Sequence, residues 1–213
     1  MDGFSEVLLR STSDKLDARS RDYLNRIRES AQQMGRLIEG LLALARLGRA
    51  ALSYTSVDLS ALAASVVADL RRAEPARDVA VEIAPGMHVT GDATVLTIVY
   101  KNLIENAWKY TSKRANAKIE IGTAPTAENA VFFVRDDGVG FDMAYAAKLF
   151  GVFQRLHGAN EFPGTGIGLA TVKRVMQRLG GEVWGEGEPD RGSTFYFSLP
   201  NQRPQGGEPC PNP

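Results

Sequence analysis

The chain has 213 residues, and its 25 lysines and arginines balance 25 aspartates and glutamates. This length gives room for one or two domains with a sizeable core, and the balanced charge argues against nucleic acid as a partner. The single cysteine, Cys210, excludes a disulfide within the chain, and a reducing, cytoplasmic setting is expected. No apolar run reaches the roughly 20 residues of a membrane-spanning helix, so we expect no membrane segment here.

Residues 1–50 are predicted to form a helical hairpin. Residues 4–10 resemble the last turns of a first helix, and a long second helix is expected from about residue 17 to 47. Apolar or small residues recur along it at alternating steps of four and three, at Ser20, Leu24, Ile27, Ala31, Met34, Ile38, Leu41 and Ala45. This spacing is typical of a four-helix bundle, so we expect a homodimer; a hairpin packed on its own globular domain is the alternative.

The rest of the chain predicts an α+β domain. Residues 51–56 are expected to be a linker, 57–200 the domain and 201–213, which contain four prolines, a flexible tail. Periodic apolar residues predict helices that begin near residue 59, at residue 93 and at residue 168. Extended segments are expected at 79–83, 88–92, 118–122, 131–135, 183–184 and 193–199. The economical arrangement is a two-layer α/β sandwich, with helices on one face of a largely antiparallel sheet.

The helix expected at 93–110 carries a polar stripe beside its apolar one. Asn102, Asn106 and Lys109 lie three to four residues apart and therefore share one side of the helix. An asparagine oxygen can bind Mg²⁺, and a lysine can bind phosphate. The stripe favours a nucleotide site, although an ordinary amphipathic helix remains the alternative.

Two glycine-rich turns follow this helix. Asp136-Asp137-Gly138-Val139-Gly140 comes directly after a strand, where glycines allow close approach of a planar ligand and a carboxylate can accept a hydrogen bond from an amine. Residues 164–168, Gly-Thr-Gly-Ile-Gly, open the last helix, whose backbone amides can bind an anion. Residues 149–160 lie between the turns, and their length and lack of pattern are typical of a lid.

The order of these segments resembles one family. An asparagine helix, Asp-x-Gly-x-Gly, Phe-x-x-Phe and Gly-x-Gly-x-Gly follow one another over about seventy residues, as in the catalytic domain of sensor histidine kinases. That domain shares its fold with the gyrase and heat-shock chaperone ATPases. Residues 4–47 resemble the preceding dimerisation hairpin of the subgroup linked to PAS and phytochrome sensors. The resemblance implies ATP and Mg²⁺ as cofactors, a homodimer, and a response-regulator receiver domain as partner.

The resemblance also implies roles for individual residues. Asn106 corresponds to the magnesium ligand, Asp136 to the carboxylate that reads adenine, and Arg155 to a possible phosphate or hairpin contact. The remaining nucleotide-site residues are Asn102, Lys109, Tyr110, Gly138, Gly140, Phe150, Phe153, Gly164, Thr165, Gly166, Gly168 and Leu169. Of these, the resemblance implies that Gly138 and Gly140 let the lid hinge open and that Phe150 and Phe153 are the lid aromatics.

The phosphoacceptor of the family is a histidine on the first hairpin helix. Residues 1–50 contain no histidine, and the two in the chain, His88 and His157, are expected to be surface residues rather than acceptors. We expect that the acceptor lies just upstream of this sequence, and that the fragment binds ATP·Mg²⁺ without phosphorylating itself at the usual site.

Three alternatives differ in class from a histidine kinase. A non-catalytic dimerisation and docking module with a vestigial nucleotide site would also lack the acceptor. A hydrolase of the gyrase or mismatch-repair type would carry a glutamate at position 102, where this chain has an asparagine that cannot act as a base, so slow ATP hydrolysis is expected. A serine-kinase anti-sigma factor shares the nucleotide fold but lacks the hairpin.

Overall fold

A computed structural model of the chain describes residues 17–46, 51–124, 129–158 and 161–200. The chain divides into two compact units, Met1–Arg46 and Leu47–Pro213, each of which is described by itself. The first helix of the expected hairpin and the expected C-terminal tail lie outside the described residues. Within the described parts of the chain, no helix combines the length and apolar character that crossing a bilayer requires.

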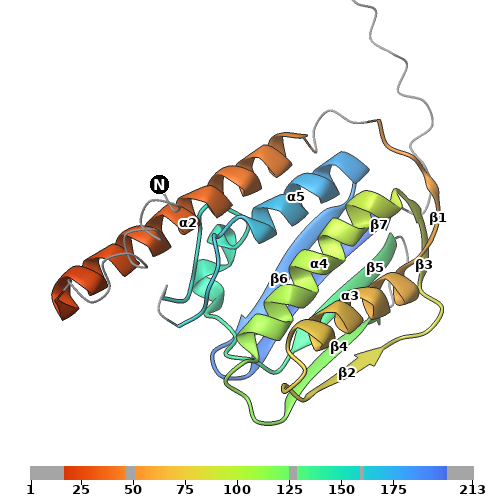
Figure 1. The fold of residues 1–213 in the computed structure, drawn as a ribbon. Coiled ribbons are helices and arrows are strands. Elements are labelled where there is room, and N and C mark those ends of the chain that lie inside the picture. Colours follow the sequence, from red (N-terminus) through yellow and green to blue (C-terminus); the bar gives the residue numbers. More distant parts are fainter. Residues whose placement is uncertain (1–16, 47–50, 125–128, 159–160, 201–213) are drawn as a thin grey trace, which may run out of the picture. The chain divides into compact units, whose positions relative to one another are not determined.

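The described part of the first unit is one helix, α2 (Ala18–Arg46), close to the predicted bounds (Figure 1). Asp17 caps its start, because its carboxylate accepts a hydrogen bond from the Ser20 amide at 2.7 Å. The predicted apolar stripe remains in contact with solvent: Ile27 and Ile38 are each 54% exposed and Met34 is 52% exposed. Such a stripe is the surface on which a second helix would pack.

The second unit is a two-layer α/β sandwich, as predicted. Its main sheet has five strands in the order β2-β4-β5-β7-β6, and only the β2–β4 pair is parallel. The strands are β2 (Val79–Ile83), β4 (Ala117–Ala124), β5 (Asn129–Asp136), β6 (Glu182–Glu188) and β7 (Gly192–Pro200). Several strands run beyond their predicted ends, because ladder pairing continues past the residues whose apolar alternation identified them.

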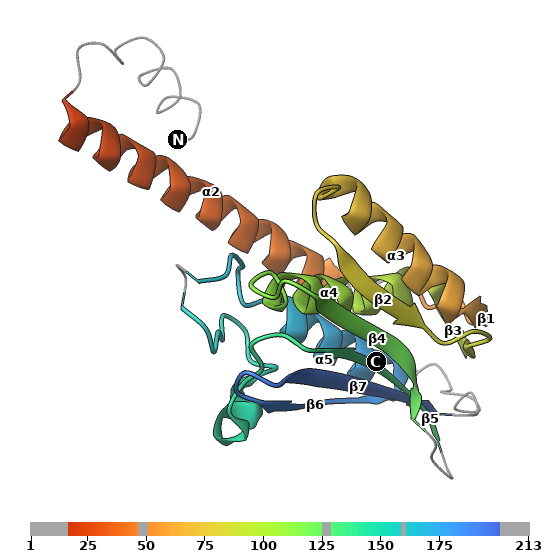
Figure 2. The ribbon, with the colours of Figure 1, turned by 90° about the horizontal axis from the view of Figure 1, so that it is seen from below.

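Three helices cover one face of this sheet: α3 (Leu59–Ala73), α4 (Ala93–Tyr110) and α5 (Gly168–Leu179) (Figures 1 and 2). Helix α4 lies between the other two. Tyr100 of α4 is fully buried with its ring edge against Phe197 of β7, at 5.5 Å between centroids. The central position of α4 fixes where its polar stripe meets the loops at the end of the sheet.

One strand was not predicted. Strand β1 (Thr55–Asp58) pairs antiparallel with β3 (His88–Gly91) in a separate two-stranded sheet, so Thr55 and Ser56 are strand residues rather than linker. Only Val57 of β1 is buried, which leaves too little alternation for a strand to be recognised from the sequence. Asp58 then caps α3 by accepting a hydrogen bond from the Ala61 amide, which confirms the predicted helix start.

Candidate functional site

A polar cavity of about 270 Å³ lies where α4 meets the glycine-rich turn before α5. It is lined by Asn102, Glu105, Asn106, Lys109, Tyr110, Leu149, Gln154, Arg155, Pro163, Gly164, Thr165, Gly166, Gly168 and Leu169. Ten of the fifteen residues predicted for a nucleotide site are in this set. Segments separated by about sixty residues in sequence therefore converge on one hollow, as the motif order predicted.

The polar stripe of α4 forms one wall of this cavity. The ammonium group of Lys109 donates to the side-chain oxygen of Asn106 at 3.2 Å and lies 4.2 Å from the centre of the Tyr110 ring. Burial, together with the nearby positive charge of Arg155, lowers the pKa of Lys109 to about 8. An anion in the cavity would favour the charged form of Lys109. This wall therefore suits a phosphate better than another cation.

The glycine-rich turn forms the opposite wall. Gly166 has φ +73°, and a side chain there would meet the carbonyl oxygen of Gln154 at 2.9 Å. A side chain at Gly168 would meet the amide oxygen of Asn102 at 2.7 Å, so α4 and the start of α5 touch at this point. The turn thus brings backbone amides and the N-terminus of α5 close to the lysine wall, the arrangement that binds anions.

A second, narrow cavity of about 50 Å³ adjoins the first and shares five lining residues with it. Its lining is Tyr110, Gly140, Phe141, Lys148, Leu149, Gln154, Arg155, Leu156, His157, Leu169, Ser193 and Phe195. The wide cavity is polar and the narrow one is largely apolar. The two cavities together suit a nucleotide: the polar one suits its charged phosphates, and the apolar one suits its flat, weakly polar base.

Asp136 lines neither of these two cavities; together with Ser193 it lines a larger groove on the helix-free face of the sheet. Its carboxylate is 4% exposed and accepts hydrogen bonds from the Ser193 hydroxyl at 2.6 Å and the Gly138 amide at 2.9 Å. Burial raises the pKa of Asp136 to about 6, although both hydrogen bonds act in the opposite direction. Since Ser193 itself lines the narrow cavity, Asp136 is one hydrogen bond away from it.

The Asp-x-Gly-x-Gly turn is fixed by backbone contacts on both sides. The Val139 amide donates to the Tyr110 carbonyl at 3.2 Å, and the Val139 carbonyl accepts from the Asp190 amide at 2.8 Å. Gly140 has φ +60°, and a side chain there would overlap the Glu188 carbonyl oxygen. Its glycine is therefore required by close packing, and the hinge role that the resemblance implied stays a prediction.

Of the predicted site residues in the lid segment, some line the cavities and others do not. Neither Phe150 nor Phe153 lines either cavity; Phe150 packs partly against the core, and Phe153 is 51% exposed. Arg155 does line both, and its guanidinium donates to the carbonyls of Gly164 at 2.7 Å and Phe162 at 2.6 Å. The arginine therefore ties the lid segment to the chain that leads into the glycine-rich turn.

Glu105 and His157 are two charged or titratable lining residues whose place in the site the sequence did not indicate and which bear on its chemistry. Glu105 lines the wide cavity beside Asn106 although the two differ by about 100° around the helix, and it also lies 3.9 Å from Lys101 in an ion pair. His157 was expected on the surface but is half-buried in the narrow cavity. Its position depends on a turn of irregular chain, for which sequence periodicity gives no signal.

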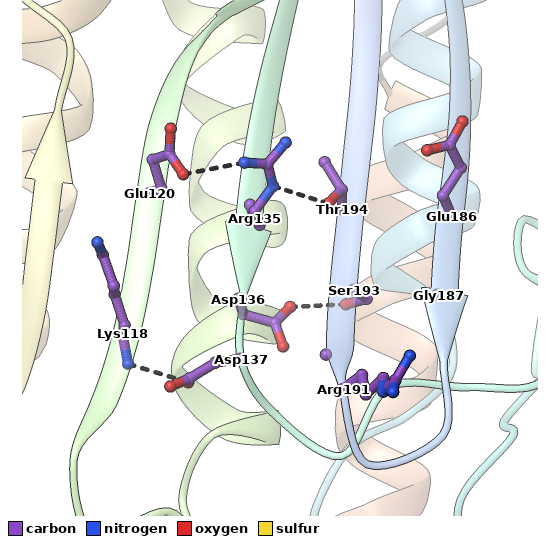
Figure 3. Close-up of a pocket in the computed structure, with 11 residues that line it drawn as sticks. Lys118, Glu120, Arg135, Asp136, Asp137, Glu186, Gly187, Arg191, Ser193 and Thr194 are labelled. Carbon is purple, nitrogen blue, oxygen red and sulfur yellow. Dashed lines mark hydrogen bonds and ion pairs between the residues drawn. The ribbon is translucent and has the colours of Figure 1, made fainter.

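A larger groove of about 440 Å³ lies on the opposite, helix-free face of the sheet (Figure 3). Its charged side chains are already paired: Arg135 bonds Glu120 at 3.1 Å, and Lys118 pairs with Glu82 at 2.9 Å. Figure 3 shows Arg135 reaching across to Thr194, so these groups satisfy one another across the strands. Apart from Asp136 and Ser193, which line it at the end of β5 and the start of β7, the groove has the character of a solvated sheet face. The two smaller cavities are the candidate site, and the Asp136–Ser193 hydrogen bond connects the groove to the narrow cavity.

Two family descriptions match this chain. Residues 91–203 match the family described as histidine kinase-, DNA gyrase B-, and HSP90-like ATPase, and residues 1–50 match the His Kinase A (phospho-acceptor) domain. The first match spans more than half of the chain and includes every element of the candidate site. The chain belongs to the histidine kinase-, DNA gyrase B- and HSP90-like ATPase family.

Its curated relatives include sensor kinases of the phytochrome group. The chain is 30% identical over 197 residues to the phytochrome-like protein Cph1 of Synechocystis, covering 92% of this chain and 26% of that protein. It is 34% identical over 199 residues to cyanobacterial phytochrome B of Nostoc, with the same coverage. The chain thus spans about a quarter of the length of these relatives.

Solved structures agree with the fold. Full-length ShkA, crystallised in complex with AMPPNP, superimposes with a TM-score of 0.66 at 27% identity, covering 93% of this chain and 42% of that one. The histidine kinase AdeS of Acinetobacter baumannii gives a TM-score of 0.67 at 20% identity, covering 94% and 95%. The expected fold class and the phytochrome-linked resemblance are both confirmed.

Proposed function

We propose that this chain is the catalytic core of a sensor histidine kinase, which binds ATP·Mg²⁺ and transfers the γ-phosphoryl group to a histidine. One observation carries the proposal: Asn106, Lys109, Arg155 and the Gly164–Gly168 turn line a single polar cavity beside an apolar one. Lysine, arginine and helix amides meet the phosphates, and the apolar end takes the base. Phosphoryl transfer requires mainly such positioning and charge neutralisation.

The residues of the wide cavity fit a magnesium ion that arrives with the nucleotide. Asn106 offers an amide oxygen and Glu105 a carboxylate, which are hard donors of the kind Mg²⁺ prefers. In the described parts of the chain, no three histidine, cysteine, aspartate or glutamate side chains gather into a metal site. We therefore propose that Asn106 holds Mg²⁺ only together with nucleotide phosphates, where the ion neutralises charge on the transferred group.

The base would be read at the narrow cavity. Asp136 is the buried acceptor for the exocyclic amine of adenine, because its carboxylate has lone pairs left after the bonds from Ser193 and Gly138. Tyr110 lines both cavities and would lie along the nucleoside between base and phosphates. Asn102, Thr165 and Leu169 complete the walls around it.

The remaining steps involve groups outside these residues. No histidine lies within residues 1–50, so the phosphoacceptor is a histidine that this sequence does not supply. We propose that 1–50 is the dimerisation hairpin, that 57–200 is the catalytic domain, and that the phosphoryl group passes to an aspartate of a response-regulator receiver domain. Because this reaction uses ATP, we place it in the cytoplasm.

Nucleotide binding with and without Mg²⁺ tests the proposal. Isothermal titration with AMPPNP is expected to show binding that weakens when Mg²⁺ is removed. Asn106→Ala should remove most of the Mg²⁺ dependence while leaving the weaker metal-free binding in place. Asn116→Ala, in an exposed turn after α4, is the matched control and should behave as wild type. If AMPPNP does not bind wild type, or if its Mg²⁺ dependence survives in Asn106→Ala, the proposed site is wrong.

A further inference from the structure

The narrow cavity is too small for the base that the proposed function assigns to it. Its volume of about 50 Å³ is room for a few waters at about 10–15 Å³ each, whereas ordinary ligand pockets have about 300 Å³ or more. A purine therefore cannot enter until some lining group moves aside.

The candidates for that movement differ in how firmly they are held. Phe141, Leu149 and Phe195 are core residues with at most 7% of their surface exposed. His157, by contrast, is half-buried and lies on irregular chain beyond the lid aromatics. Lys148, Gln154 and Arg155 also line the cavity outside the core, but His157 is the one bonded to Gly140 on the facing turn. Its displacement would open the cavity and leave the core intact.

Two kinds of contact hold His157 in place. Its Nε2 lies 2.8 Å from the carbonyl oxygen of Gly140, so Nε2 must carry the proton and donate it. Its ring lies against Tyr110 at 5.3 Å and Phe162 at 5.5 Å between centroids. These contacts join the lid to the Asp-x-Gly-x-Gly turn across the cavity that leads to Ser193 and Asp136.

We propose that His157 is a gate that closes the base end of the site. With its bond to Gly140 made, the imidazole occupies space that the base needs, and on the narrow-cavity side Ser193 lies between the cavity and Asp136. With that bond broken, the imidazole swings out of the cavity and the base can lie against Tyr110. This inference rests on the proposed function, because it assumes that the base enters by the narrow cavity.

Removing the imidazole should therefore make nucleotide binding faster. The gate is held by one hydrogen bond and two aromatic contacts, so His157→Ala is expected to speed association of a fluorescent ADP analogue by about tenfold in stopped-flow measurements. His157→Phe keeps a ring but has no donor, and should lie between wild type and His157→Ala. His88→Ala, in exposed strand β3, is the matched control and should leave the rate unchanged.

A second readout needs no nucleotide. In a Cys210→Ser background, Ser193→Cys places a thiol between the narrow cavity and the groove on the helix-free face. A small methanethiosulfonate reagent should label it slowly from the groove, at a background rate that is the same in both arms. Adding His157→Ala should raise the labelling rate by about tenfold if the imidazole closes the cavity. The substitution at 193 is present in both arms, so its effect on Asp136 cancels.

The two readouts distinguish a failure of the gate proposal from a failure of the proposed nucleotide-binding function. Faster labelling in a protein that binds no ADP would support the gate and contradict the proposed function. Normal ADP binding with unchanged labelling and association rates in His157→Ala would contradict the gate alone. Slower association in His157→Ala would also overturn it, since it would show that the imidazole helps the nucleotide to bind rather than excluding it.

Discussion

At the scale of single residues, two groups of the proposed site have pKa values that are shifted in opposite directions. Asp136 is buried and its pKa is raised to about 6, and Lys109 is buried beside Arg155 and its pKa is lowered to about 8. Both shifts come first from burial, which disfavours the charged form of either group. In the proposed site each group acts in its charged form, Asp136 as an acceptor for the base and Lys109 as a contact for phosphate.

The affinity for ADP should consequently pass through a maximum between about pH 6 and pH 8. Below about 6 the Asp136 carboxyl gains a proton and loses its strength as an acceptor; above about 8 free Lys109 loses its proton and its attraction for phosphate. Each limb should approach tenfold per pH unit. Titration of ADP across this range measures the profile.

Adenosine is the matched ligand for that experiment, because it has the base without the phosphates. Its affinity should fall on the acid side and stay flat on the alkaline side. An alkaline decline of equal size for adenosine would show that Lys109 does not act through phosphate, and a flat ADP profile would contradict both assignments.

The residue scale is also where sequence reasoning succeeded and failed most clearly. Asn102, Asn106 and Lys109 were found because helical spacing places them on one side of α4, and local geometry alone decides this. His157 was missed because its contact with Gly140 joins segments 17 residues apart that have no regular structure. Phe150 and Phe153 were assigned to the site by motif, and neither lines it.

At the scale of elements, the start of α5 depends on the backbone of the preceding turn. Gly166 has φ +73°, its carbonyl accepts from the Phe153 amide at 3.0 Å, and a side chain there would meet the Gln154 carbonyl oxygen. The turn thus joins the lid to the anion-binding end of the helix. Its glycine has both a conformational and a steric reason to be present.

Gly166→Ala should lower stability and weaken ADP binding by more than conformational strain alone explains. A positive φ costs an alanine roughly 1–2 kcal/mol, and the close Gln154 carbonyl adds to this by displacing the turn. Gly180→Ala is the control, because Gly180 has φ +72° at the end of α5 and nothing within 4 Å of the added carbon. Chemical denaturation and ADP titration compare the two.

Of the two variants, only Gly180→Ala should keep wild-type affinity for ADP. Its loss of stability should be close to the roughly 1–2 kcal/mol that a positive φ costs an alanine. Equal effects of the two substitutions on ADP binding would show that the close approach at Gly166 has no part in shaping the site.

The elements themselves were largely predictable. The bounds of α4 and α5 follow from apolar periodicity and from the Asp92 cap, whose carboxylate accepts from the Thr94 amide at 2.9 Å. Strand β1 was missed because four residues with one buried side chain have no periodicity. Its pairing with β3 depends on contacts between segments that are distant in sequence. Strand order could not be derived, since local sequence does not encode which strands become neighbours.

At the scale of the whole molecule, α2 has an apolar stripe that the described residues of its own unit, 17–46, do not bury. Tyr23, Ile27 and Met34 line a shallow apolar hollow along the helix, and all three are about half exposed. Heptad-like spacing of this kind is stabilised by a second copy of the same surface. The match of residues 1–50 to the phospho-acceptor domain agrees with that proposal.

Ile27→Asp should convert a dimer into a monomer, because a carboxylate would be buried without a partner at the centre of the helix interface. Asn25→Asp adds the same charge to another side of α2 and should leave the dimer intact. Sedimentation velocity measures both. A monomeric wild-type protein, or a dimeric Ile27→Asp variant, would contradict the assignment of this stripe.

The central claim is that separate segments of the second unit form one adenine-nucleotide site with Asp136 at its base end. Isothermal titration of ADP with Mg²⁺ against wild type, Asp136→Ala and Asp137→Ala tests it most directly. Loss of a hydrogen bond to a charged acceptor should weaken binding to Asp136→Ala by roughly tenfold to a hundredfold. Asp137→Ala, whose carboxylate accepts from the Lys118 amide on the other side of the turn, should bind as wild type. Unchanged affinity in Asp136→Ala would contradict the account.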